Sequence, residues 1–428
     1  PAPPGRAVGE RTILAPWFSD FYSPFVPLIG RCAGYRIENL PPPDARSAEL
    51  GLQYVNNEVC YPAILVVGDL IRALRGGRYD PAGVAVGITQ TGGQCRASNY
   101  IALIRRALAD AGFGGVPVLS LAVSRAVGSR RSGFRPDWLR AVRPAFGAVL
   151  YADALSRMYH ATAPRERVAG EAARLRDRYI GLACASWGDD GPGPLPGLLR
   201  AAVADFNAVA TAVDEVRAVG VVGEIYVKYN SFGQAGIVDW LIARRVEPVL
   251  PPLVEFFTQA FVNAGVRRDD FLQRRRPLDF LAPFLERAAE RVEGRFEEAA
   301  RGFRFHRPVE GIRGAARLAA EALSLDNQYG EGWLIPAGIA SCARQGIRHA
   351  VCLQPFGCIA NHVVGKGMEM RMKSLYPDMN LLYLDFDSGV SRVNVLNRLH
   401  FLIQNIPAGD GGTFPAGGAY TGGRNDKG

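Results

Sequence analysis

Four cysteines stand in sequence surroundings that suit ligands for a soft metal better than a hydrophobic core. Cys60 lies in Asn-Glu-Val-Cys-Tyr-Pro, Cys95 in Thr-Gly-Gly-Gln-Cys-Arg, and both Cys352 and Cys358 in Val-Cys-Leu-Gln-Pro-Phe-Gly-Cys. Each is expected where a strand-like apolar run gives way to a loop. Iron–sulfur clusters require thiolates, and the sequence contains no Cys-x-x-Cys pair of a zinc ribbon. The loops therefore predict an iron–sulfur site, and their spacing disfavours structural zinc.

The other cysteines and the composition limit the class of protein. Cys32, Cys184 and Cys342 lie in runs such as Leu-Ala-Cys184-Ala-Ser, for which we expect packing in helices. The chain has 428 residues, of which 48% are hydrophobic and 21% charged, as is typical of a globular protein that folds without metal. Seven cysteines, no apolar leader and no apolar run near about 20 residues argue against a disulfide framework and a membrane span. We therefore expect a cytoplasmic protein.

The net charge of +9 comes mostly from arginines scattered through helical stretches. No dense basic block is interleaved with aromatic residues, so we expect no nucleic-acid partner. The arginines are interpreted as a solvated helix face, with a docking surface for an acidic partner or a phosphorylated substrate as the alternative.

Strand-like and helix-like apolar patterns alternate along the chain. This alternation predicts two α/β halves, each an open parallel sheet of flavodoxin or Rossmann type. We expect strands at 12–15, 35–40, 84–88, 116–121, 221–230, 246–250, 349–353 and 380–386, and helices at 63–74, 100–111, 333–345, 363–376 and 394–406. Pro62 suits a helix first turn, which puts Cys60 at a helix N-terminus. Open α/β sheets bind ligands at strand carboxyl ends, so the cysteine pairs should meet in a cleft between the halves.

The predicted organisation has five parts. Residues 1–10 are expected to form a tail of a piece that begins at Pro1 rather than Met, and residues 407–428 a disordered glycine-rich tail. The first α/β domain, 11–137, carries Cys60 and Cys95. A helical linker covers 138–218. The second α/β domain, 219–406, carries Cys352 and Cys358 and a helical insertion at 254–323.

Six sequence blocks in this order resemble the 2-hydroxyacyl-CoA dehydratase family, particularly its large activase-related members, in which an ATPase activator is fused to a dehydratase-like module. The blocks are Asn56–Val66, Thr89–Ile101, Val222–Asn230, Gly330–Trp333, Cys352–Gly367 and Asp385–Gly389. The resemblance implies flavodoxin-like domains and a 4Fe-4S cluster in their cleft, reduced by an ATP-hydrolysing activator. Related double-cubane proteins hold an 8Fe-9S cluster, which is expected to need more thiols than these four.

Carried over to this chain, the resemblance assigns cluster ligands to Cys60, Cys95 and Cys358. Cys352 stays open: it is a fourth ligand, a ligand to a second cubane, or a buried thiol. The implied function is radical dehydration or difficult reduction of a small substrate, with a CoA thioester as one candidate, in which one low-potential electron makes a ketyl radical that expels a hydroxyl group. The alternative is a non-catalytic electron carrier or cluster-binding partner module of a larger activase protein. A homo- or hetero-dimer is compatible with both.

Candidates for catalysis are His362, Glu58 and Arg96, each of which also has a structural interpretation as a cap, a surface group or an ion-pair member. Glu224 and Glu331 also lie in blocks of the resemblance. Each is either a group that faces the cleft or a capping or surface group. The run Val364-Gly-Lys-Gly367 at a predicted helix start would favour an anion. No Walker A or dinucleotide-binding glycine motif follows a strand, so the ATPase is expected on another domain or subunit.

Overall fold

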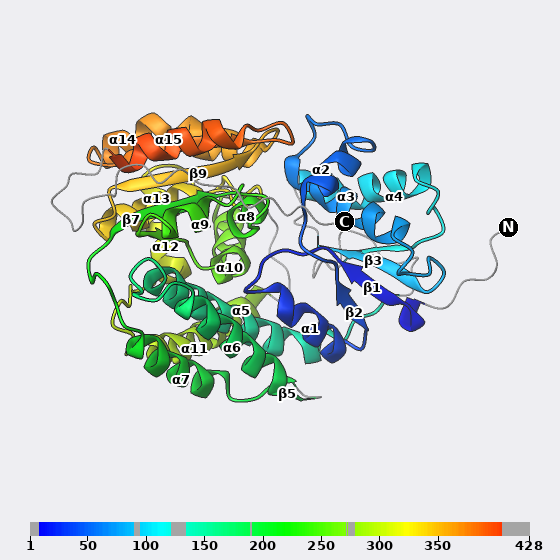
Figure 1. The fold of residues 1–428 in the computed structure, drawn as a ribbon, viewed down its shortest axis with the longest axis horizontal. Coiled ribbons are helices and arrows are strands. Elements are labelled where there is room, and N and C mark those ends of the chain that lie inside the picture. Colours follow the sequence, from blue (N-terminus) through cyan, green and yellow to red (C-terminus); the bar gives the residue numbers. More distant parts are fainter. Residues whose placement is uncertain are drawn as a thin grey trace.

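The chain folds into two parallel α/β units and a group of helices that packs beneath them (Figure 1). The computed structural model describes residues 8–89, 95–120, 134–188, 191–270, 272 and 279–404. The expected tails at 1–10 and 407–428 lie wholly or mostly outside these residues, as do Gly92 and Gly93. Within the described residues, no helix combines the length and the apolar character that crossing a bilayer requires.

The first sheet has the order β2-β1-β3-β4, and all of its strands run parallel. Its strands are β1 (Thr12–Ala15), β2 (Ile37–Asn39), β3 (Val84–Ile88) and β4 (Val118–Ser120). Its helices are α1 (Val26–Cys32), α2 (Ala45–Leu52), α3 (Tyr61–Arg75) and α4 (Tyr100–Asp110). Every residue of β3 is buried, which explains why this strand is a continuous apolar run in the sequence.

The second sheet has the order β10-β9-β7-β8 and is also parallel throughout. Its strands are β7 (Arg217–Gly223), β8 (Val246–Val249), β9 (His349–Pro355) and β10 (Asn380–Phe386). Helices α8 (Ile225–Tyr229), α9 (Ile237–Ile242), α13 (Leu334–Arg344), α14 (Glu369–Leu375) and α15 (Arg392–Gln404) connect or flank these strands. The two parallel sheets make the fold α/β, as the alternating patterns predicted.

Two local predictions for this half are wrong. The strand expected at 221–230 ends at Gly223, because the backbone there turns to a φ of 121° and Glu224 caps helix α8. A side chain at Gly223 would collide with the backbone of Leu353 in the neighbouring strand. The single helix expected at 363–376 is instead a π turn (Asn361–Gly365), a 3-10 turn (Lys366–Met368) and then α14.

The helical group joins parts of the chain that lie far apart in the sequence. It contains α5 (Trp138–Thr162), α6 (Glu171–Ala185), α7 (Leu195–Ala208) and α11 (Ala282–Ala300), with α10 (Val254–Asp269) and α12 (Gly311–Ala320) leading back to the second sheet. Side chains from α5, α6, α7 and α11 share one buried cluster that also takes in Phe25 of the first α/β unit. A short hairpin of β5 (Trp187–Gly188) and β6 (Gly191–Pro192) interrupts the helices.

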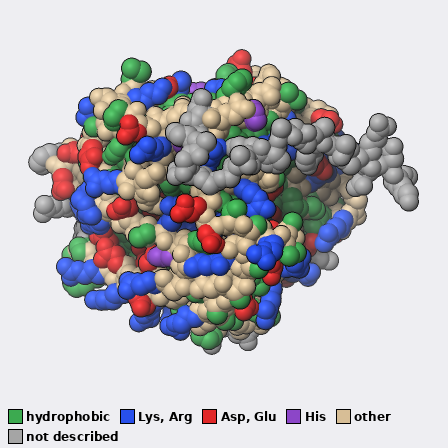
Figure 2. All heavy atoms as spheres, turned by 60° about the vertical axis from the view of Figure 1, so that its left-hand side comes forward, with side chains coloured by type: hydrophobic (Ala, Val, Ile, Leu, Met, Phe, Trp, Pro, Cys, Tyr) green, Lys and Arg blue, Asp and Glu red, His purple; other side chains and the backbone are tan. Residues whose placement is uncertain are grey.

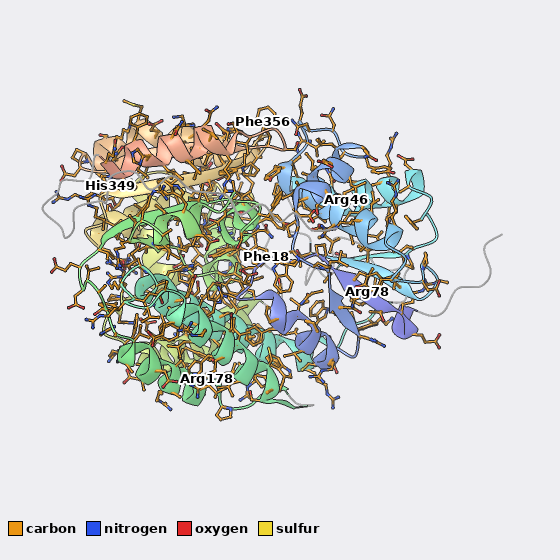
Figure 3. All side chains as sticks on the ribbon, in the orientation of Figure 1. Phe18, Arg46, Arg78, Arg178, His349 and Phe356 are labelled. Carbon is orange, nitrogen blue, oxygen red and sulfur yellow. The ribbon has the colours of Figure 1, made fainter. Side chains whose placement is uncertain are left out.

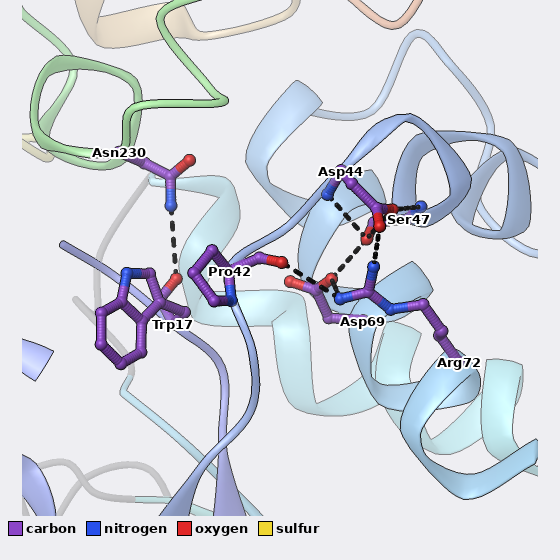
Figure 4. Close-up of polar contacts among 7 residues, drawn as sticks. All are labelled: Trp17, Pro42, Asp44, Ser47, Asp69, Arg72 and Asn230. Atoms are coloured by element: carbon purple, nitrogen blue, oxygen red, sulfur yellow. Dashed lines mark hydrogen bonds and ion pairs between the residues drawn. The ribbon is translucent and has the colours of Figure 1, made fainter. Parts of the chain in front are cut away.

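The first and second units are joined by direct contacts. Phe18 lies between them in Figure 3, where its ring packs near those of Tyr226 and Tyr229 from α8. The amide of Asn230 donates a hydrogen bond of 3.4 Å to the backbone oxygen of Trp17 (Figure 4). It also donates one of 3.2 Å to the backbone oxygen of Phe18. Asn230 thus satisfies loop backbone and fixes the loop after β1 against the second sheet.

The surface carries both signs of charge side by side. On the face in Figure 2, arginine and lysine side chains alternate with aspartate and glutamate rather than forming one basic field. Ion pairs such as Arg178–Asp205 and Arg301–Glu298 account for part of this pattern. This face fits the interpretation of the arginines as solvated helix surfaces.

Candidate functional site

Cys60 opens helix α3 as its N-cap residue, with Pro62 in the first turn as the sequence predicted. It follows helix α2 and a loop rather than a strand, so the expectation of a strand end is wrong for this cysteine. Its Sγ lies 3.2 Å from the hydroxyl of Tyr100, the first residue of α4. Both side chains are buried, so the thiol is held in one position by two helix starts.

Cys95 and Cys358 lie at the carboxyl ends of strands from the two sheets. Cys95 follows β3 and precedes the 3-10 turn Arg96–Asn99, and its side chain is partly exposed. Cys358 follows β9 after the turn at Phe356 and Gly357, and it is buried. Its Sγ accepts a 3.2 Å hydrogen bond from the amide of Asn361, which is itself fully buried.

The structure brings the loops that carry these three cysteines close together, as two close approaches show. The Cys358 loop touches the Cys60 loop, since a Cβ added at Gly357 would lie 2.8 Å from the oxygen of Glu58 and 3.0 Å from that of Val59. A Cβ added at Gly330 would lie 3.8 Å from Cys95 Sγ and 3.5 Å from the side chain of Ala360, two residues after Cys358. Figure 3 places Phe356 of the Cys358 loop at the border between the two units.

The surroundings of Cys60 and Cys358 favour the protonated form of these two thiols. Burial raises the pKa of the Cys60 thiol to about 12, and Glu224 and Cys95 add to the rise, whereas the hydrogen bond with Tyr100 lowers it. Burial likewise raises the pKa of Cys358, with further increases from Glu331 and Glu224 and a partial offset by Asn361. A thiolate here therefore needs a compensating positive charge, which a bound metal supplies.

Glu224 and Glu331 form a buried carboxyl pair beside the thiols. Glu224 accepts a 2.7 Å hydrogen bond from the backbone N–H of Val227, and Glu331 accepts one of 2.8 Å from Ile225, so both cap the start of α8. Burial and mutual repulsion raise the pKa of Glu224, and burial raises that of Glu331. The caps that the sequence allowed for these carboxylates are present, and the pair also sets the charge around Cys60 and Cys358.

Cys352 is not at a strand end, and the expectation that it lies there with Cys358 is wrong. It is the fourth residue of β9 and packs in a buried cluster with Ile335, Val364 and Tyr383. A Cβ at Gly365 would lie 3.5 Å from its Sγ, so the thiol faces the turn after β9. Burial raises its pKa to about 12. Its position is that of a buried thiol, because it lies within a strand in which every residue is buried.

The other predicted candidates lie on exposed loops. The side chains of His362, Glu58 and Arg96 are all exposed, His362 in the π turn after Cys358, Glu58 two residues before Cys60, and Arg96 directly after Cys95. Lys366 of the expected anion site forms an ion pair with Glu369 instead. Helix α14 has seven residues, so its start offers no extended anion site.

Two glycines and one amide shape the immediate surroundings of the thiols. Among the described residues, no three His, Cys, Asp or Glu side chains form a group that could bind one metal ion. Glycines at 330 and 357, with φ of 64° and 77°, let the backbone come close to the thiols. The Oδ1 atom of Asn361 is buried without a partner in the described part of the chain, which leaves an unused acceptor beside Cys358.

Sequence reasoning missed the second layer of the site, which consists of Tyr100, Asn361, Lys228 and Glu255. Asn361 lies three residues after Cys358, a spacing that could have signalled its hydrogen bond. Tyr100 reaches Cys60 across forty residues of sequence, and no local pattern marks that contact. Lys228 stands in Ile-Tyr-Val-Lys-Tyr, where a charge among apolar residues was a signal of a buried role.

Comparisons with known proteins add no assignment. No protein family model matches the chain, and no curated protein matches it at a significant level.

Proposed function

We propose that this chain is an iron–sulfur protein in which Cys60, Cys95 and Cys358 hold a 4Fe-4S cluster, and that it serves radical dehydration or difficult reduction of a small substrate. The observation that supports the proposal is the close approach of three cysteine-bearing loops, two that follow strands of different sheets and one at the start of α3. The resemblance to 2-hydroxyacyl-CoA dehydratases supports the cluster type and the reaction class. When bound, such a cluster supplies one electron at low potential.

The chain's own residues would hold, orient and shield the group. The Tyr100 hydroxyl would donate to a metal-bound Cys60 thiolate, and Asn361 donates to Cys358 Sγ; hydrogen bonds to sulfur tune the potential of clusters. Glu224 and Glu331 add negative charge or carry protons beside it, depending on pH. Negative charge near the site disfavours extra electrons, so carboxyls held neutral by burial keep reduction accessible.

A catalytic role is favoured over a pure carrier by the number of thiols. A carrier would use four thiolates in a closed site, but Cys352 points into the core of the second unit rather than toward the other three. Three thiolates leave one iron open to a substrate oxygen. Cys95 is also partly exposed, so a small molecule has access to this side of the site.

The electron source would be an ATP-hydrolysing activator on another domain or subunit. The described residues contain no phosphate-binding loop after a strand that could perform the hydrolysis here. The exposed side chains of Phe356 and Ile359 on either side of Cys358 offer a contact surface close to the thiols.

Anaerobic reconstitution with iron and sulfide tests the proposal. We expect wild type to take up iron and sulfide in equal amounts and to give an electron paramagnetic resonance signal after reduction. Cys358→Ala and Cys95→Ala should each lose most of the iron while circular dichroism stays that of a folded protein, because the hydrophobic core does not depend on metal.

Cys184→Ala is the matched control, because this thiol lies in α6 among the helical group and away from both sheet ends. It should retain the iron of wild type. Equal iron in all three variants would show that these loops hold no cluster, and the proposal would then be wrong.

A further inference from the structure

Lys228 is a buried lysine without an ion pair among the described residues. It lies in α8, four residues after Glu224, and only 9% of its surface is exposed. Its Nζ stands 4.7 Å from the ring centre of Tyr229, and no carboxylate of the described chain comes within ion-pairing distance of it. A lysine that is buried in this way without a fixed partner is rare in protein cores, because its charged form loses hydration.

Lys228 lines a small cavity with two carboxyl groups. The cavity, of about 20 Å³, is bounded by Lys228, Glu255 and Glu331 and by apolar walls from Val222, Pro251, Phe256, Leu334 and Ile335. A space of this size with several polar groups is large enough for a water molecule. Glu331 is common to this cavity and to the thiol site, since it acts on the pKa of Cys358. The cavity therefore lies directly behind the site.

A larger cavity continues from the small one. It measures about 80 Å³ and lies between α5, the loop at 303–310 and α13. Both cavities are lined by Tyr229, Pro251, Pro252 and Glu255. Glu255 accepts no hydrogen bond in the described part of the structure, in contrast to nearby Asp153, whose oxygens bind Tyr22, Leu253 and Val254. Glu255 is thus the polar group that faces both cavities with its hydrogen-bonding capacity unused.

We propose that Glu255 and Lys228 form a buried proton relay that leads from the larger cavity to Glu331 at the thiol site. The inference rests on the proposed function, since reduction or dehydration of a substrate at that site consumes protons. A hydronium ion that reaches the larger cavity gives a proton to the Glu255 carboxylate and is left as a water molecule. The O–H bond of Glu255 then breaks as an N–H bond forms on the neutral amine of Lys228, and the resulting ammonium passes its proton to Glu331. Each step moves one proton and no electrons.

The charges around the two groups suit this transfer. Burial lowers the pKa of Lys228, opposed by Glu331, Glu255, Glu224 and Asp153, so its neutral form is accessible. Burial raises the pKa of Glu255 to about 7, with Lys228 and Arg157 opposing the rise and Asp153 and Glu293 adding to it. The lowered pKa of Lys228 and the raised pKa of Glu255 therefore bring the proton affinities of donor and acceptor closer together.

Two variants of Lys228 distinguish a lysine that transfers protons from one that only balances the charge of nearby carboxylates. Lys228→Met removes the amine, whereas Lys228→Arg keeps the positive charge but cannot release a proton. In reconstituted protein mixed with a low-potential reductant, a pH-indicator dye should report proton uptake with reduction in wild type. We expect both variants and Glu255→Gln to slow that uptake at least tenfold with unchanged iron content and circular dichroism. Wild-type uptake in Lys228→Arg would show that the lysine only balances charge and would overturn the relay.

Metal-free protein supplies a readout that does not depend on the cluster. Several buried carboxyls, Asp69 and Glu224 among them, have raised pKa values, so the readout is a difference between proteins. The infrared titration of wild type minus that of Glu255→Gln should contain a protonated carboxyl band that disappears near pH 7, and the same difference taken on a Lys228→Met background should have a shifted midpoint. If wild type binds no iron, the proposed function fails while this titration still tests the relay. A band that is the same in all three proteins would refute it.

Discussion

At Gly357 the backbones of the two α/β units come close together beside the candidate site. Its φ is 77°, and an added Cβ would lie 2.8 Å from the backbone oxygen of Glu58. Gly346, after α13, has a φ of 74° with open space around it. The two glycines therefore share one backbone conformation and differ in whether a neighbouring loop is present.

We expect Gly357→Ala to be more destabilising than Gly346→Ala. Both substitutions impose the left-handed conformation on a residue with a Cβ, at about 1–2 kcal/mol. Gly357→Ala also pushes the Cys358 loop away from the Cys60 loop. Urea denaturation should show an excess loss of free energy for Gly357→Ala, together with reduced iron uptake. Equal losses in the two variants would mean that the loop contact contributes nothing.

Asp69 makes the stability of the first unit depend on pH. It is buried in α3, where Ser47 donates to it at 2.6 Å and Arg72 lies at 3.3 Å (Figure 4). Burial raises its pKa to about 7, although Ser47 and Arg72 lower it. Between about pH 4 and 7 the folded chain keeps a proton that the unfolded chain releases, so this contribution is complete below pH 4 and is lost as pH rises to 7.

We expect Asp69→Asn to flatten this dependence. Relative to the variant, wild type should lose free energy of unfolding between pH 5 and pH 7, by at most about 1.4 kcal/mol per pH unit. Urea denaturation of both proteins at the two pH values gives the difference. Asp177→Asn on the exposed face of α6 is the control. Parallel pH profiles for wild type and Asp69→Asn would contradict the assignment.

At the scale of elements, one carboxylate ties a strand to a helix and a loop. Glu247 of β8 is buried and accepts from Arg165 Nη2, just beyond α5, at 2.8 Å and from Arg307 Nε of the 303–310 loop at 2.8 Å. Removing one charge from a buried pair leaves the other uncompensated. The helical group and the second sheet are therefore held together by a charge cluster as well as by apolar packing.

Glu247→Gln should lower the free energy of unfolding by about 3–5 kcal/mol, because two buried or half-buried guanidinium groups lose their counter-charge. Glu298→Gln, which breaks the exposed pair with Arg301, should lower it by less than about 1 kcal/mol. Chemical denaturation measures both. A small loss at Glu247 would show that water already solvates the two arginines.

The elements that the sequence predicted well are those in which local pattern and burial agree. Val84–Ile88 and Asn380–Phe386 are short apolar runs and form β3 and β10 with those bounds. The run after Gly223 was misread because Ile225, Tyr226 and Val227 favour strands, while the turn at Gly223 and the cap at Glu224 make them helical.

Cys352 was misplaced because the length of β9 was underestimated by two residues. The contacts of Lys228 and Tyr100 arise from tertiary packing between distant segments. No local sequence pattern predicts such contacts.

At the scale of the whole molecule, Asn230 is a direct polar link between the two α/β units. Besides its bonds to Trp17 and Phe18, its Oδ1 accepts from the N–H of Gly233 at 2.8 Å. Only 1% of the surface of Asn230 is exposed. Water therefore cannot reach its partners to replace the hydrogen bonds that its amide makes. Loss of its amide should therefore affect the loops of both units together.

Asn230→Ala should lower the free energy of unfolding by about 1–3 kcal/mol, the penalty for buried polar groups left without partners. Hydrogen exchange should accelerate both near residues 17–19 and near residues 231–236. Asn207→Ala breaks two hydrogen bonds of an exposed side chain to Gly302 and Arg304 and should change exchange only locally. Faster exchange on one side alone would argue against a link between the units.

The arrangement of the three thiols also bears on how the protein is made. Cys60 and Cys95 are synthesised early, but their partner Cys358 leaves the ribosome only after β7, the helical group and β9. Strand β9 in turn needs β10 and β7 on its two sides before its loop is fixed. A nascent chain can therefore complete its first unit but cannot yet offer a three-thiol site. If the proposed cluster is correct, iron can be bound only after β9 and β10 have been made, and ribosome-bound chains stalled before β9 should carry no iron.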